Sequence, residues 1–229
     1  MEDHYIRLIP KEIRELGFPI ARFLSEEEQA KYEESIKQFS GNAYDSLNIL
    51  RKGSNLWKVL FLNQIGIRTP TLPELEIALE NGMPLSEHYV NGREVILRSR
   101  GDSYQRNNYL AETLADKLKL KSFKHPYIIR GLGIKQSETP KVIDCDGLEF
   151  LTDDTEVKEA PDFNHENHGK KFRRINEDYS IEWDEKGSRT FYARKDGLSR
   201  LFLSWGLDLG SDNERLAGSG GYSRVVVIS

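Results

Sequence analysis

The C-terminal stretch from Gly197 to Ser229 constrains the fold of this chain more than any other part of the sequence. Leucines recur there among small polar residues, and the stretch ends in an unbroken apolar run. Leucines two positions apart lie on one face of an extended strand, and four consecutive β-branched residues are typical of a strand buried on both faces. We call these residues the apolar frame: Leu198, Leu201, Leu203, Leu207, Leu209, Leu216, Val225, Val226, Val227 and Ile228.

The residues between the positions of the apolar frame are of a different kind. They include more glycine, serine, aspartate and asparagine than hairpin turns alone require, together with aromatic side chains. This composition is typical of binding loops, in which small polar residues adapt their hydrogen bonds and aromatic residues give rigid contacts. A Gly/Ser-rich loop packed on a sheet is the structural alternative. The candidate ligand-binding residues are Phe202, Ser204, Trp205, Gly206, Asp208, Gly210, Asp212, Asn213, Glu214, Gly218, Gly220, Gly221 and Tyr222.

Composition excludes several classes of protein. The chain has 229 residues and a formal net charge of -4, and it has no basic block, which argues against a nucleic-acid binder. No apolar run is long enough to span a bilayer, and we expect no secretory signal because the N-terminus lacks an apolar segment. Cys145 is the single cysteine, so no intrachain disulfide and no thiolate metal cluster can form.

The first third of the chain has helical patterns. Ser25 with Glu28 predicts a capping box at the start of a helix that ends near Ser40. We predict that residues 1–42 form an extension packed on the main domain, with a short strand or arm at Tyr5 to Ile9. Apolar residues at helical spacing continue through residues 42–62, and Thr71 with Pro73 and Glu74 predicts a helix that runs to about Glu80.

The remainder of the chain favours short strands, which makes the fold α+β. An amphipathic helix is predicted at 109–120, and the charged stretch 153–174 is predicted to be a surface excursion. Strands are predicted at 93–100, 125–134, 141–151, 178–184, 189–194, 198–203 and 224–228.

Two segments carry a resemblance to known families. The stretch from Ala43 to Gly82 contains NAYDSLNIL and WKVLFLNQIGIRTPTLPELEIALENG, and Arg68, Pro70, Thr71 and Glu74 form an R-x-P-T-x-x-E helix start. This stretch resembles the two-helix section of the C-type lectin fold in its formylglycine-generating-enzyme-like branch. The C-terminal pattern L-S-R-L-x-L-x-x-x-L-x-L-x-S-x-x-x-x-L-A-x-S, followed by R-V-V-V, resembles the variable region of diversity-generating retroelement variable proteins of bacteria, archaea and their viruses.

The resemblance implies a fold and a function. We expect residues 43–229 to form a C-type lectin fold in which two helices pack on short antiparallel strands and the C-terminal strand is central. The variable region would span about 200–224, with exchangeable side chains that face solvent and bind a target, often a protein. In that family, replacement of template adenines turns Asn codons into codons for residues such as Ser, Asp, Gly, Tyr and Phe. Display on a virion or cell surface is compatible with this function, and the target and the oligomeric state remain unspecified.

Metal and catalytic chemistry are the alternatives. His165 to His168 is compact and polar, but it lacks the helical spacing that presents two imidazoles to one metal ion, so a solvated loop is favoured. Asp208, Asp212, Asn213 and Glu214 could supply oxygen ligands to calcium, although no EF-hand pattern is present. We expect no cofactor and no enzyme activity, because the sequence has no Ser-His-Asp pattern, phosphate loop or dinucleotide fingerprint. A metal-dependent sugar binder or enzyme of the same fold is the main alternative, and a structural virion component is another.

Overall fold

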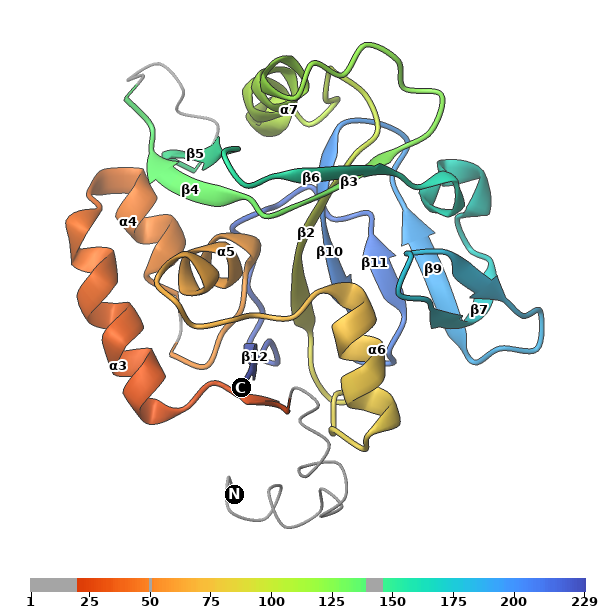
Figure 1. The fold of residues 1–229 in the computed structure, drawn as a ribbon, viewed down its shortest axis with the longest axis horizontal. Coiled ribbons are helices and arrows are strands. Elements are labelled where there is room, and N and C mark those ends of the chain that lie inside the picture. Colours follow the sequence, from red (N-terminus) through yellow and green to blue (C-terminus); the bar gives the residue numbers. More distant parts are fainter. Residues whose placement is uncertain (1–19, 50, 139–145) are drawn as a thin grey trace.

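The computed structural model describes residues 20–49, 51–138 and 146–229, and it is an α+β fold (Figure 1). The predicted strand at Tyr5 to Ile9 and Cys145 lie outside these residues. The described α-helices are α3 (Glu26–Ser35), α4 (Gly41–Leu47), α5 (Leu56–Gln64), α6 (Leu72–Glu80) and α7 (Gln105–Lys117), and the 3-10 helices are η1 (Ile36–Gln38), η2 (Pro161–Phe163) and η3 (His165–Asn167).

The described residues form one curled eight-stranded sheet and two strand pairs. In the large sheet only the neighbours β11 and β9 are parallel. One pair joins β1 (Ala21–Phe23) to β12 (Val226–Ile228), and the other joins β4 (Gly133–Gln136) to β5 (Leu148–Leu151). The large sheet has the spatial order β6 (Glu156–Glu159), β3 (Tyr127–Arg130), β2 (Val90–Leu97), β10 (Leu198–Leu203), β11 (Leu209–Ser211), β9 (Arg189–Ala193), β7 (Lys171–Ile175) and β8 (Ile181–Trp183).

The predicted capping box at Ser25 and the predicted N-cap at Thr71 are both confirmed. Ser25 accepts a hydrogen bond from the main-chain N–H of Glu28, and the Glu28 carboxylate accepts one from Ser25 N–H. Thr71 and Glu74 form the same reciprocal pair at the start of α6, whose C-cap is Asn81. Each box satisfies amide groups that the first turn of a helix leaves without an intrahelical partner.

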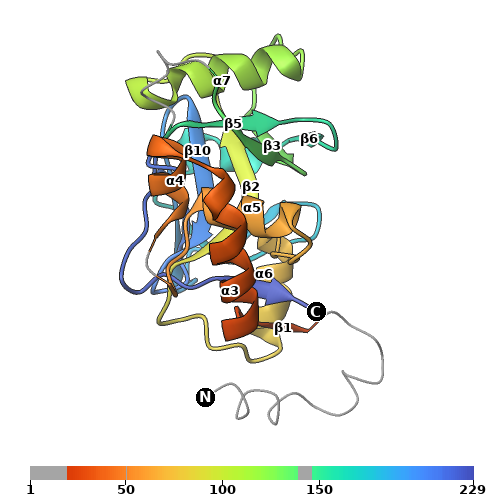
Figure 2. The same cartoon turned by 90° about the vertical axis from the view of Figure 1, so that its left-hand side faces the viewer.

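The large sheet separates two hydrophobic clusters. Val95 and Leu198 belong to the first cluster, together with residues of α3, α4, α5 and α7. Ile96, Leu201 and Leu203 belong to the second cluster, together with α6 and strands β7 and β9. The alternation along β2 and β10 follows from the two-residue period of a strand. In Figure 2, α7 lies across one end of the sheet, and the C-terminus lies beside β1.

The prediction of a central C-terminal strand is wrong. Within the described residues β12 pairs only with β1, outside the large sheet. Its β-branched side chains are nevertheless buried on both faces, since Val225 and Val227 pack in the first cluster and Val226 and Ile228 in the second. A position between two cores therefore produces the same sequence pattern as a position in the middle of a sheet.

Two further predictions about strands are wrong. The stretch 153–174 is part of the sheet, because it contains β6, the start of β7 and the fully buried Phe163. Its charged residues fit the exposed edge position of β6, where charge also prevents pairing with other chains. Leu207 is only half-buried and has a positive φ of 64° in the turn between β10 and β11, so it does not continue the two-residue alternation of Leu209.

Candidate ligand-binding face

Strand pairing brings residues from β10, β11 and β9 to one face of the sheet, and these strands lie side by side in Figure 1. Phe202 is paired with Gly210, and Gly210 is paired with Tyr192. Directly paired residues point to the same side of a sheet. The neighbouring pair Leu203 and Leu209 points to the other side, where both side chains are buried in the second cluster.

Aromatic side chains gather on this face. Trp205 and Tyr222 are 47% and 58% exposed, and their ring centroids are 4.7 Å apart. Tyr89 is bound through its main-chain N–H to Tyr222 O, and its ring lies 6.1 Å from that of Phe202. Four of the five large apolar side chains that are exposed in the described part of the chain belong to this surface. We call it the aromatic face, defined by Tyr89, Tyr192, Phe202, Trp205 and Tyr222.

The structure places the predicted binding residues at three levels of exposure. The residues at the tips of the two turns are the most accessible, and those at the ends of the strands are less so. Two residues within strands are buried. The exposed group is Trp205, Gly206, Asp212, Gly220, Gly221 and Tyr222; the half-buried group is Ser204, Asp208, Asn213, Glu214 and Gly218; the buried pair is Phe202 and Gly210.

The expectation that Phe202 and Gly210 are solvent-facing is therefore wrong. The Phe202 ring lies against Gly210, where an added Cβ would stand 2.2 Å from Phe202 Cζ. The guanidinium of Arg200 also contacts the ring, with its Cζ 5.0 Å from the ring centroid. Asp208 also has a structural contact, because its Oδ1 accepts a 2.6 Å hydrogen bond from the main-chain N–H of Thr190. Phe202, Gly210 and Asp208 therefore have structural contacts within the face.

The segment 212–224 is held mainly through its own main chain. Asn107 Nδ2 donates to Glu214 O at 2.7 Å, and Asn55 Nδ2 donates to Ala217 O at 3.0 Å. Arg200 donates to Gly218 O at 2.8 Å. Main-chain amides of Leu56 and Tyr89 donate to Leu216 O and Tyr222 O. A carbonyl oxygen is present whichever side chain its residue carries, so these bonds survive side-chain exchange.

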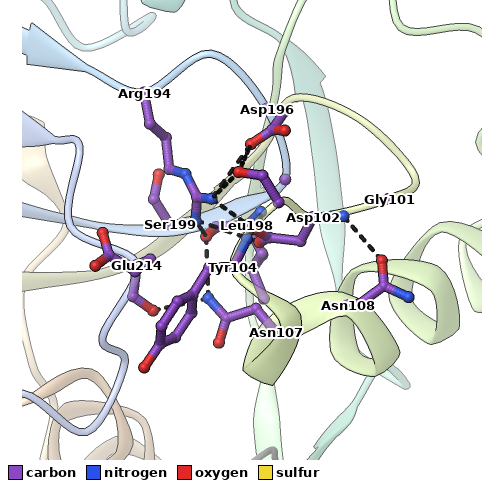
Figure 3. Close-up of polar contacts among 12 residues, drawn as sticks. Gly101, Asp102, Tyr104, Asn107, Asn108, Arg194, Asp196, Leu198, Ser199 and Glu214 are labelled. Carbon is purple, nitrogen blue, oxygen red and sulfur yellow. Dashed lines mark hydrogen bonds and ion pairs between the residues drawn. The ribbon is translucent and has the colours of Figure 1, made fainter.

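A polar cluster fixes the turn that leads into β10 (Figure 3). Asp102 is buried, and its carboxylate accepts hydrogen bonds from Leu198 N–H at 2.7 Å and Tyr104 N–H at 2.8 Å. Arg194 forms an ion pair with Asp102 at 2.5 Å and donates to Leu198 O at 3.0 Å. Asn107, which donates to Leu198 O and Glu214 O, lies in the first turn of α7, so the cluster joins α7, β10 and the segment 212–224.

Two buried arginines of the large sheet and its end have no carboxylate in direct contact among the described residues. Arg200 donates to Asn91 Oδ1 and Gly218 O, whereas Arg98 donates to the hydroxyls of Ser199 and Ser211. Burial lowers the pKa of Arg98 to about 9 and that of Arg200 to about 10. The negative charge of Asp212 acts in the opposite direction on both groups. Asp212 therefore helps to balance buried positive charge.

An open depression adjoins Phe202. Its volume is about 370 Å³, and it is lined by Phe202, Asp212, Asn213, Glu214 and Arg215. Asn213 Oδ1 accepts a hydrogen bond from Arg215 N–H, which holds the amide at the rim. The carboxylates of Asp212 and Glu214 make no hydrogen bond or ion pair within the described part of the chain. The depression thus combines an aromatic wall with two carboxylates that are available to a ligand.

The histidine pair lies at the edge of the face. His165 Nδ1 and His168 Nδ1 each lie 3.0 Å from Ala193 O, and the ring of His168 contacts that of Tyr192 at 5.7 Å. Within residues 20–49, 51–138 and 146–229, no three His, Cys, Asp or Glu side chains gather into a group that could hold a metal ion. None of the described helices is long and apolar enough to cross a membrane.

No protein-family model, curated protein or solved structure matches this chain.

Sequence analysis missed several residues that build the face. Tyr89 and Tyr192 lie far from the C-terminal stretch, and only strand pairing brings them to Phe202 and Gly210. The supporting residues Asn55 and Asn107 were also missed. Asn55 is the N-cap of α5, and a polar residue directly before an apolar helical run is an available signal for such a cap. Asn107 lies among other polar residues in the first turn of α7, so the sequence does not distinguish it from its neighbours.

Proposed function

We propose that this chain is a non-catalytic ligand-binding protein of the diversity-generating retroelement variable class, with a C-type lectin scaffold and a target that is a protein. The aromatic face and the exposed residues around it form the binding surface. Tyr and Trp supply rigid contact area at interfaces, and small polar residues around them supply adaptable hydrogen bonds. The neighbouring glycines at 206, 220 and 221 lie in exposed turns, where other side chains have room.

One observation carries the proposal. The rest of the fold binds the segment 212–224 through hydrogen bonds to its main-chain carbonyl oxygens, whereas the exposed side chains of this segment make few contacts. Asn55, Asn107 and Arg200 supply donors from α5, α7 and β10. Side chains can therefore be exchanged while the main chain keeps its position. A protein that presents many different surfaces on one fold needs this separation between support and display.

Sequencing the locus tests the proposal. We expect a second, near-identical copy of the codons for residues 200–229 that differs from the first copy at adenines, together with a reverse transcriptase gene. The differences should fall on codons of exposed positions such as 205, 212 and 222, and they should spare the codons of the apolar frame. A locus without such a repeat would refute the assignment to this class.

A further inference from the structure

We infer that the depression beside Phe202 receives an arginine side chain of the partner protein, which makes Asp212 and Glu214 the residues that determine specificity. This inference rests on the proposed function and gives the partner its chemistry. The lining combines two carboxylates, the amide of Asn213 and the Phe202 ring. Its volume of about 370 Å³ is at the lower end of the range of about 300–1,000 Å³ for ligand pockets, which suits a single side chain.

The donor and acceptor count favours a guanidinium. Asp212 and Glu214 together offer four carboxylate oxygens, and neither carboxylate has a hydrogen bond or ion pair to another described residue. A guanidinium has five N–H donors in a planar fork that matches carboxylates, and it also stacks on aromatic faces. A lysine ammonium has three donors around a point charge, so it forms fewer hydrogen bonds to the two carboxylates and does not stack on an aromatic ring.

The protein already contains one example of this contact. The Arg200 guanidinium lies over the Phe202 ring, with Cζ 5.0 Å from the centroid, and the charges of Asp212 and Glu214 act on it. The exposed pair of Trp205 and Tyr222 lies on the same surface and offers apolar contact to residues that flank the partner's arginine. Arg215 on the rim and the buried Arg200 are opposing features, because their positive charges repel a basic side chain.

A random peptide library displayed on phage tests the inference against the full-length protein. We expect peptides selected on the wild type to be enriched in arginine next to apolar residues. A resynthesised peptide should bind at least about tenfold more weakly to an Asp212→Asn/Glu214→Gln variant, a loss equivalent to about 1.4 kcal/mol. Its binding to the wild type should weaken as salt is raised, because the charge pairs are partly exposed. Replacement of its arginine by lysine should also weaken binding, and Arg215→Gln should strengthen it.

The remaining outcomes separate this inference from the proposed function. One outcome is that the selected peptides lose binding to a Trp205→Ala/Tyr222→Ala variant but have no arginine enrichment and bind the Asp212→Asn/Glu214→Gln variant as well as the wild type. This outcome would overturn the arginine assignment and leave the binding face intact. Selected peptides that are indifferent to both double variants would overturn the binding face itself. Urea denaturation of each variant tests whether the fold is retained. If the Asp212→Asn/Glu214→Gln variant unfolds, the salt dependence of binding and the arginine-to-lysine peptide are still measured on the wild-type protein and decide the question.

Discussion

At the scale of single residues, Gly210 is required for packing, unlike the exposed glycines of the neighbouring turns. We expect Gly210→Ala to destabilise the protein by about 1–3 kcal/mol, as overpacking does, because the new Cβ would stand 2.2–2.6 Å from three atoms of the Phe202 ring. Urea denaturation would measure this loss, and a Gly210→Ala/Phe202→Ala double variant should show strong coupling between the two sites.

Gly220→Ala is the matched control for this substitution. An added Cβ at Gly220 meets nothing within 4 Å, and its φ is not in the left-handed region. Its free energy of unfolding should stay within about 0.5 kcal/mol of the wild type. Equal effects at the two glycines would show that Gly210 is as exchangeable as the turn glycines, contrary to the packing described above.

Glu94 gives a prediction for pH dependence. It is fully buried, accepts hydrogen bonds from Leu72 N–H and Tyr179 Oη at 2.8 Å each, and burial raises its pKa from 4.5 to about 7. The folded state thus binds the proton at Glu94 more tightly than the unfolded state, so the contribution of Glu94 to stability is greatest below pH 4.5 and is lost as the pH rises to about 7. Glu94→Gln should remove this dependence, which amounts to about 3 kcal/mol at about 1.4 kcal/mol per pKa unit.

Denaturation of the wild type and Glu94→Gln across pH 4 to 8 checks this prediction. The variant should gain stability relative to the wild type between pH 4.5 and about 7 and show no further relative gain above that. Parallel curves would mean that Glu94 titrates alike in the folded and unfolded states. Tyr179→Phe should move the midpoint of the difference to higher pH, since the Tyr179 hydroxyl stabilises the ionised carboxylate.

At the scale of elements, the N-cap residue of α5, Asn55, also donates a hydrogen bond to the segment 212–224. Asn55 Oδ1 accepts from Lys58 N–H at 2.8 Å, and its Nδ2 donates to Ser46 O and Ala217 O. Asn55→Ala should cost about 1 kcal/mol for the lost cap and a further ~1–3 kcal/mol for carbonyl oxygens left without a donor. Hydrogen exchange should become faster in residues 212–224.

Thr71→Ala is the comparison variant, because Thr71 caps α6 without touching that segment. It should cost only about 1 kcal/mol and leave exchange in residues 212–224 unchanged. If both variants had the same effect on exchange, the segment would not depend on Asn55 for its position.

Elements of this fold could be predicted from sequence where their signals are local. The capping box at Ser25 and the N-cap at Thr71 depend on residues within one helical turn, and both were predicted correctly. The position of β12 could not be predicted, because burial between two clusters gives the same run of β-branched residues as burial in a sheet. The membership of Tyr89 and Tyr192 in the aromatic face depends on long-range strand pairing, which a single sequence does not display.

At the scale of the whole molecule, the fold predicts a sharp contrast in tolerance to substitution along the C-terminal segment. Val226 is buried in the second cluster beside β1, whereas Tyr222, four residues earlier, is 58% exposed. Val226→Asp would bury a carboxylate without a partner, which costs several kcal/mol and is large relative to a typical total stability of about 5–15 kcal/mol. Tyr222→Asp should change the free energy of unfolding by less than about 0.5 kcal/mol.

Two display libraries extend this contrast to the full surface. One library randomises the exposed positions 205, 206, 212, 220, 221 and 222, and the other randomises six positions of the apolar frame: 201, 203, 209, 216, 226 and 227. After protease challenge we expect most of the first library and few members of the second to survive, because only folded chains resist cleavage. If similar fractions of the two libraries survived, the apolar frame would not be what holds the aromatic face in place. The proposal that buried residues fix the fold while exposed side chains can be exchanged would then be wrong.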